Sequence, residues 1–315
     1  MNQTIQAEPG AFDVTFSCNV ANADMYIDGN EYGHPRGTRT LKTGSHHVQL
    51  VAEGYEDLTM TINVDSDSTS FNFKMSRVVP QEPYVAKIET FTVKGVSFDM
   101  VFVEGGTFMM GATLEQGSDA ENDEKPTHQV TLSDYYISKY EVTEELWIAV
   151  MGKKRGLQRD SKKPIMYVSW EDCQNFIKRL NQLTGKSFCL PTEAQWEYAA
   201  RGGKWSRGHT YSGGNNIEDV AWIVSNSGGV THPVGQKSPN ELGLYDMSGN
   251  VWEWCQDCYD NYSSVQQTNP LGSSGSYRVN RGGGWSYNAA DCRVSRRSAN
   301  NPTSTDRDLG LRLVL

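Results

Sequence analysis

Residues 242–254 read Leu-Gly-Leu-Tyr-Asp-Met-Ser-Gly-Asn-Val-Trp-Glu-Trp, and residues 281–286 read Arg-Gly-Gly-Gly-Trp-Ser. Both stretches follow Gly202, beyond which the helical spacing of apolar residues disappears and Gly, Asn, Ser and Trp become frequent. Glycine and asparagine favour turns, because they adopt backbone angles that other residues avoid. This region therefore predicts long, packed loops around a few strands.

Three helices are expected before Gly202, each preceded by a hydroxyl side chain that can accept a hydrogen bond from the first turn. The helix expected after Ser169 carries one apolar stripe, which predicts that one of its faces is buried. The stripe consists of Cys173, Phe176, Ile177 and Leu180. The expected caps and helices are Thr143 before 144–151, Ser169 with Asp172 before the stripe, and Thr192 with Gln195 before 193–201.

Seven blocks of sequence resemble, in the same order, the formylglycine-generating enzyme (sulfatase-modifying factor) family. They extend over residues 98–315, and the ordered set is much more specific than any single block. The resemblance implies a mixed α/β fold related to C-type lectins, with little regular secondary structure. The blocks are FVEGGTFMMG (102–111), YISKYEVT (136–143), VSWED (168–172), LPTEAQWEYAARGG (190–203), LGLYDMSGNVWEW (242–254), RGGGWS (281–286) and LGLRLV (309–314).

Residues 11–76 predict a small all-β unit, because short segments alternate apolar and polar side chains with period two. Gly44 and Gly54 are expected in its turns. The motifs at 23–29, 42–48 and 52–57 resemble the PEGA domain, a small β-sandwich often appended to cell-envelope proteins. The expected strands are Phe12–Cys18, Met25–Gly29, His47–Val51, Leu58–Val64 and Ser70–Met75.

The expected fold class is therefore α+β, with two domains. A PEGA-like β-sandwich at 11–76 is followed by a linker at 77–94, which holds Pro80 and Pro83. A loop-rich mixed α/β domain of the formylglycine-generating-enzyme and C-type-lectin-like kind is expected at 95–315, beginning with a strand near Phe98–Val103. The acidic residues within 115–124 predict a solvated loop.

The composition is that of a globular protein: 315 residues, 37% hydrophobic and 21% charged, with 30 glycines. The net charge of −9 disfavours a nucleic-acid partner, since it repels the phosphate backbone. No apolar stretch is long enough to span a bilayer, and Met1–Glu8 has no signal-peptide character. The PEGA resemblance nevertheless favours an extracytoplasmic location, in the periplasm or at the cell surface.

The family resemblance implies a copper centre that this chain lacks. Family enzymes hold Cu(I) between two cysteines spaced Cys-x-x-x-x-Cys and use oxygen to oxidise a cysteine of a sulfatase peptide. Soft thiolate ligands suit Cu(I). The matching segment, 284–293, contains only Cys292, and the second family cysteine falls near Ala289. We therefore expect no copper and no catalytic residue of the family type.

Three cysteines leave an alternative open. Cys255 and Cys258 form a Cys-x-x-Cys pattern, which binds metal or exchanges disulfides in some proteins. With Cys292 they could form a relocated redox or metal site, or Cys255 could bridge to Cys292. We favour a structural role, in which Cys255 packs in the core after Trp254 or bridges to Cys292. The alternative function is an oxidoreductase that uses these relocated cysteines.

The resemblance also implies a calcium site. Family members hold the ion with two side chains and two carbonyls, and the matching positions are Asp246, Gly249, Val251 and Glu253. Carboxylates and backbone oxygens are suitable ligands for this hard cation. The competing interpretation is a hydrogen-bonded turn without a metal.

The remaining candidates concern ligand binding. Trp285, Tyr287, Asn288 and Arg293 are predicted to line a ligand groove near the lost copper site. The clustered arginines suit either an acidic ligand or a structural role tying loops to carboxylates such as Glu253 or Asp306, and we favour the second. They are Arg293, Arg296, Arg297, Arg307 and Arg312. The expected function is a non-catalytic module at the cell envelope that binds a protein, peptide or glycan.

Overall fold

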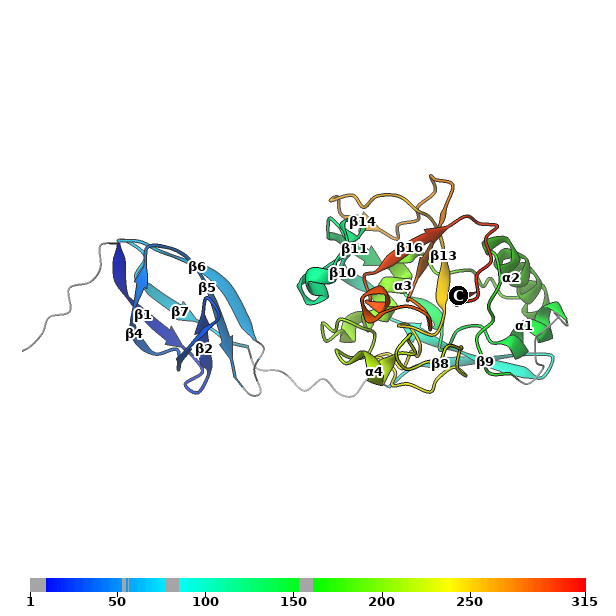
Figure 1. Ribbon diagram of the computed structural model, residues 1–315, viewed down its shortest axis with the longest axis horizontal. Helices are drawn as coiled ribbons and strands as arrows, with labels where there is room; N and C mark the ends of the chain where they lie inside the picture. The colour runs from blue at the N-terminus through cyan, green and yellow to red at the C-terminus, as the bar shows by residue number, and fades with distance from the viewer. Residues whose placement is uncertain (1–9, 53–54, 56, 77–84, 153–160) are drawn as a thin grey trace, which may run out of the picture. The chain divides into compact units, whose positions relative to one another are not determined.

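The computed structural model describes residues 10–52, 55, 57–76, 85–152 and 161–315. The chain divides into two compact units, residues 1–83 and 84–315 (Figure 1). The turn expected at Gly54 and the two prolines of the expected linker, Pro80 and Pro83, lie outside the described residues.

The first unit is a sandwich of two sheets, as expected. In one sheet β1 lies between β4, which is antiparallel to it, and β7, which is parallel. The other sheet has the antiparallel order β3-β2-β5-β6. Alternate residues of both sheets form one core, with Phe16 of β1 and Ile27 of β2 among them. The strands are β1 (Ala11–Cys18), β2 (Asp24–Ile27), β3 (Asn30–Gly33), β4 (Gly37–Lys42), β5 (Gly44–Val51), β6 (Leu58–Val64) and β7 (Ser70–Phe73).

Two of these strands were not predicted from the sequence. Neither β3 nor β4 shows a clear apolar alternation, because β3 has no fully buried residue and β4 has only Leu41. Both pair at a sheet edge, where backbone hydrogen bonds hold a strand that contributes little to the core.

Within its described residues, the second unit combines three small sheets with four α-helices. The sheet orders are β12-β9-β8, β10-β11-β14 and β16-β15-β13-β17. The strands are β8 (Ile88–Val93), β9 (Val96–Val103), β10 (Gly106–Met110), β11 (His128–Leu132), β12 (Tyr135–Ser138), β13 (Trp252–Cys258), β14 (Gln267–Thr268), β15 (Arg278–Arg281), β16 (Arg297–Asn300) and β17 (Leu309–Leu311). Within the described part, residues 203–251 contain no strand and little helix, as the glycine-rich composition predicts.

The three expected helices are confirmed: α1 (Glu144–Met151), α2 (Trp170–Thr184) and α3 (Glu193–Ala200). Thr143 caps α1, and complete capping boxes open α2 and α3. The predicted stripe of α2 is buried, and Phe176 stacks on Trp147 of α1 with ring centroids 4.9 Å apart. A fourth helix, α4 (Ile217–Val220), is a single turn.

Two expectations about this unit were wrong, the second only in part. The expected linker, 77–94, extends too far, because its residues 88–93 form strand β8, which pairs with β9 and buries Phe91 and Val93. The acidic segment 115–124 is only partly solvated, because Asp119 and Glu121 are exposed but some other residues are not. It forms two 3₁₀ turns, Leu114–Asp119 and Asn122–Glu124, whose side chains Gln116 and Glu124 are buried.

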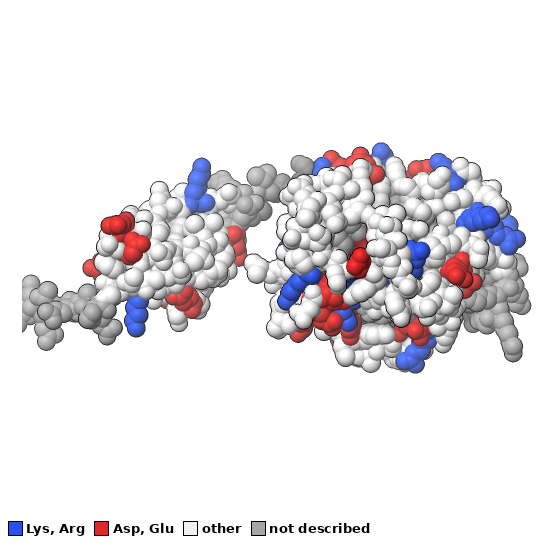
Figure 2. Space-filling view, turned by 90° about the horizontal axis from the view of Figure 1, so that it is seen from above, with Lys and Arg blue, Asp and Glu red and all other residues white. Residues whose placement is uncertain are grey.

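No helix within the described residues is long and apolar enough to cross a membrane. On the face shown in Figure 2, acidic and basic side chains are interspersed rather than gathered by sign. The described residues on that face offer no broad positive field of the kind that attracts nucleic acid.

Candidate functional site

The segment that would carry the copper ligands holds one deeply buried thiol. Cys292 ends a 3₁₀ turn, Ala289–Cys292, and its side chain is fully buried against Val220, Ala221 and Ile223. A Cβ atom at Gly283 would clash with its sulfur, so the glycine allows this close packing. Burial, together with the nearby charge of Asp291, raises the pKa of Cys292 to about 12. A protonated, enclosed thiol is a poor metal ligand and a poor nucleophile.

The other two candidate cysteines do not join it. All six cysteines are free, so the bridge considered between Cys255 and Cys292 is absent. Cys255 packs in the core with Trp196 and Val279, and burial raises its pKa well above the ordinary value. Cys258 instead lines a cleft with Asp257 and Tyr262. Among the described residues, no group of three or more metal-ligating side chains converges.

The side chains predicted to bind calcium have other partners. Both oxygens of Glu253 accept hydrogen bonds from Arg312, at 2.8–3.1 Å, and one also accepts from the indole nitrogen of Trp196 at 2.6 Å. Asp246 accepts from the backbone nitrogen of Gly235 at 2.7 Å with one oxygen, while its other oxygen has no partner. Because an arginine already neutralises Glu253, the four residues do not fit a site for a divalent cation in this arrangement.

The backbone nitrogens of Gly249 and Val251 take part in hydrogen bonds of the turn. The Gly249 nitrogen donates to the Gly282 carbonyl at 2.7 Å. The nitrogen of Val251 donates to Glu141, whose carboxylate also accepts from Asn250 at 2.7 Å. Glu141 was not predicted from the sequence, although it lies within the YISKYEVT block. It is 2% exposed, and burial, with the charges of Asp246 and Glu253 nearby, raises its pKa well above the ordinary value.

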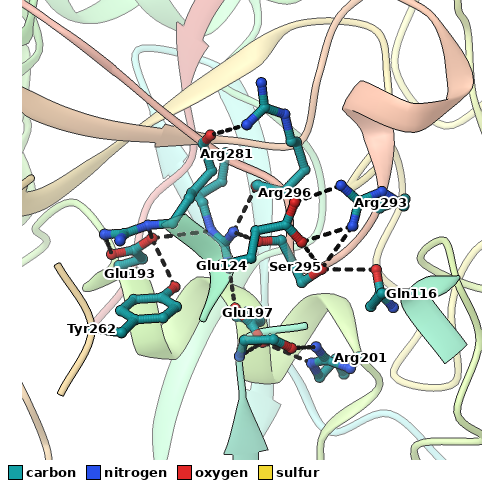
Figure 3. Close-up of polar contacts among 12 residues, drawn as sticks. Gln116, Glu124, Glu193, Glu197, Arg201, Tyr262, Arg281, Arg293, Ser295 and Arg296 are labelled. Atoms are coloured by element: carbon teal, nitrogen blue, oxygen red, sulfur yellow. Dashed lines mark hydrogen bonds and ion pairs between the residues drawn. The ribbon is translucent and has the colours of Figure 1, made fainter. Parts of the chain in front are cut away.

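The predicted structural role of the clustered arginines is confirmed for three of them, and a fourth buried arginine joins them. Figure 3 shows two of the pairs, Arg281 with Glu197 and Arg293 with Glu124. Each of the four is at most 1% exposed and pairs with a buried glutamate. The pairs are Arg281 with Glu197, Arg293 with Glu124, Arg297 with Glu193 and Arg312 with Glu253.

The local fold explains why two of these pairs, Arg281 with Glu197 and Arg297 with Glu193, connect the same two elements, α3 and the β15–β16 pair. Glu193 and Glu197 are four residues apart on α3, so their side chains project from the same face. Arg281 of β15 and Arg297 of β16 are directly opposite each other in the antiparallel pair. Arg297 holds Glu193 with two parallel hydrogen bonds, both 2.8 Å long, and the pair is removed from water.

Arg293 was predicted to contact a ligand, and this prediction was wrong. Its guanidinium reaches back to the acidic segment, where it donates to Glu124 at 2.5 and 2.7 Å and to the Asp119 carbonyl at 2.8 Å. Ser295 donates to the same carboxylate at 2.5 Å. The partners are more than 160 residues apart in the chain, so no local signal in the sequence joins them.

A surface groove lies beside the remaining predicted ligand residues. Its volume is about 460 Å³, and Trp285 lines it. The Arg307 guanidinium lies 4.8 Å from the centroid of the Trp285 ring. Tyr287 and Asn288 are exposed nearby but do not line the groove. The other lining residues are Glu144, Ser161, Lys163, Met166, Tyr167, Gly229, Val230 and Thr231.

Comparisons with known proteins support the family assignment. The model of the sulfatase-modifying factor enzyme 1-like domain matches residues 86–315, and the PEGA domain model matches residues 12–78. Chaperone protein LppX of Paenibacillus barcinonensis is 32% identical over 70% of this chain and 90% of its own length. The formylglycine-generating enzyme of Streptomyces coelicolor is 30% identical over 67% of this chain and 87% of its own length.

Two further comparisons concern a longer protein kinase and a solved structure. It spans about half the length of the serine/threonine-protein kinase Pkn1 of Chlamydia trachomatis, to which it is 31% identical over 86% of its residues. Among solved structures, Treponema denticola variable protein 1 is similar, with a TM-score of 0.64 and 32% identity over 72% of this chain and 98% of that one. The chain therefore belongs to the sulfatase-modifying factor enzyme 1-like family, and a PEGA domain precedes its family domain.

Proposed function

We propose that this chain is a non-catalytic, ligand-binding member of the formylglycine-generating enzyme-like family. The observation that carries the proposal is the segment 284–293, which has one cysteine where the enzymes need two. That cysteine, Cys292, is fully buried and has a pKa of about 12. Without a second thiolate the segment lacks the two-sided soft site that Cu(I) requires.

The proposed binding site is the groove beside Trp285. It is built by loops on a scaffold that the buried arginine–glutamate pairs hold together, and loops of this kind change specificity without disturbing the core. The proposal also includes an extracytoplasmic location, supported by the PEGA domain. Protease treatment of intact cells tests a surface location, because a chain at the surface is digested. Cell fractionation tests a periplasmic location, because such a chain is recovered with the envelope fraction.

Copper binding and oxygen consumption test the loss of catalysis. The reduced protein is titrated with Cu(I) against a chromogenic chelator, and oxygen uptake is followed with a cysteine-containing sulfatase peptide. We expect no stoichiometric copper and no peptide-dependent uptake, and the Cys292→Ser variant should behave like the parent protein. Tight one-to-one copper binding with turnover would establish the oxidoreductase alternative and overturn the proposal.

A further inference from the structure

Hydrogen bonds tie together the loops that form the groove beside Trp285. The Trp285 backbone nitrogen donates to the Asn250 carbonyl at 2.8 Å, and its indole nitrogen donates to the Arg307 carbonyl at 3.3 Å. On the opposite side, the Glu144 nitrogen donates to the Lys163 carbonyl at 2.9 Å. Because these loops are already fixed, a ligand would spend little binding energy on ordering them.

One side chain of the groove lacks a partner. Glu144 is 7% exposed, yet its carboxylate makes no hydrogen bond or ion pair with any described residue. The Glu144 carboxylate is not among the enclosed polar atoms without a partner, so it is open to the groove that the residue lines. Hydroxyl donors of a ligand can therefore reach it. Lys163 and Arg307 also line the groove, and neither is in an ion pair within the described part of the chain.

The remaining lining combines aromatic and apolar side chains with the hydroxyls of Ser161 and Thr231. Trp285 is partly exposed, and Met166 and Val230 lie on the same groove. The groove therefore offers a flat ring together with one hydrogen-bond acceptor and two strong donors. This combination complements a sugar ring, which has an apolar face of C–H groups and a rim of hydroxyls that both donate and accept hydrogen bonds.

Other ligand classes fit less well. The lining residues come from loops and the first turn of α1, so the groove has no free strand edge for an extended peptide to pair with. The apolar residues share the lining with Lys163, Glu144 and Thr231, whereas an amphipathic helix needs a groove that is apolar throughout. A neutral sugar can use Glu144 as an acceptor, whereas the carboxylate of an acidic sugar would have to avoid Glu144 and pair with Lys163 or Arg307.

We infer that the groove lined by Trp285, Glu144 and Lys163 binds a neutral saccharide chain. The sugar ring stacks on Trp285, and its hydroxyls donate to Glu144 and accept from Lys163 and Arg307. This inference deepens the proposed function and rests on it, because it names the ligand class of the same site.

The test measures binding of the full chain to neutral hexasaccharides by calorimetry. The probes are cello-, chito-, malto-, manno- and xylo-oligosaccharides, with oligogalacturonate as the acidic comparison and a pool of extended peptides. We expect at least one neutral probe to bind, and we expect Trp285→Ala and Glu144→Gln each to raise Kd by about tenfold or more. Tyr277→Ala is the matched control, since Tyr277 is 55% exposed outside the groove.

The outcomes separate this inference from the proposed function. Circular dichroism and the melting temperature of each variant show whether it is folded. If Trp285→Ala unfolds, the Kd of the folded Glu144→Gln variant still tests whether the groove binds the sugar. Binding of the peptides or of oligogalacturonate in a Trp285-dependent manner overturns the saccharide assignment but leaves a binding module. If no probe binds in a Trp285-dependent manner, the saccharide assignment also fails. Copper-dependent turnover, measured separately, overturns the proposed function.

Discussion

Replacing Arg293 with methionine should destabilise the second unit strongly. The methionine side chain fills part of the space but leaves the carboxylate of Glu124, which is 0% exposed, without its guanidinium partner. Burial alone would raise the pKa of Glu124, but hydrogen bonds from Arg293 and Ser295 hold it below the ordinary value. Removing the arginine therefore takes away the main group that stabilises the ionised carboxylate.

The expected loss can be worked from this geometry. Breaking one partner of a buried ion pair costs about 3–5 kcal/mol. For a unit of this size each kcal/mol lowers the melting temperature by about 2–4 °C, so Arg293→Met should lower it by about 6–20 °C. Differential scanning calorimetry measures the transition of the second unit directly. The double variant Arg293→Met, Glu124→Gln should recover much of the loss, because the unpaired charge is gone.

The control for this prediction is Arg307→Met, which removes an exposed arginine of the same segment. Its unfolding free energy should change by no more than about 0.5 kcal/mol. A fall of less than about 2 °C for Arg293→Met would contradict the reasoning, since it would mean that Glu124 keeps its stability without the guanidinium.

Three further predictions concern metal, pH and thiols. Calcium at millimolar concentration, or its removal with EDTA, should leave the melting temperature unchanged. If a site were present, calcium at 100 times its Kd would raise the free energy of unfolding by about 2.7 kcal/mol. A melting temperature that rises with calcium would therefore support the predicted site at Asp246 and Glu253. Burial raises the pKa of Asp246 from 3.8 to about 6, so its contribution to stability is complete below pH 3.8 and is lost as the pH rises through about 6. Asp246→Asn should therefore gain stability relative to the parent as the pH rises to 8, by up to about 3 kcal/mol for a pKa raised by about 2. Chemical denaturation at pH 5 and at pH 8 measures this gain. Equal differences at the two pH values would contradict the burial argument. Only Cys189 is exposed, and partial burial raises the pKa of its thiol, so a thiol reagent should label this one cysteine of the native chain slowly at neutral pH and the other five only after unfolding; labelling of Cys292 in the native chain would contradict its enclosed position.

The sequence predicted the local parts of this fold well. Capping boxes and the stripe of α2 locate the helices, because those signals lie within one or two turns of each other. Strand β8 was not predicted. The prolines at 80 and 83 indicate an extended connection, and the apolar alternation of β8 is short, with Phe91 and Val93 as its buried residues. Edge strands β3 and β4 gave no apolar signal at all.

The site was less predictable, and the reason is distance along the chain. The sequence identified the arginines as structural but could not choose their partners, because Glu124 lies 169 residues from Arg293. The acidic segment 115–124 looked solvated for the same reason, since the arginines that bury it come much later. In the sequence, Glu144 is an ordinary acidic residue at the start of a helix, and only the structure shows that it lines a groove.

The order of the buried ion pairs along the chain constrains when the second unit can fold. All four buried arginines lie within residues 281–315, whereas their glutamates lie between Glu124 and Glu253. While the ribosome is still making the earlier part, those carboxylates have no guanidinium to meet and cannot leave water. The PEGA unit can fold during synthesis, but the second unit must wait for residues 281–315 to emerge, and this delay makes it the part of the nascent protein most in need of protection.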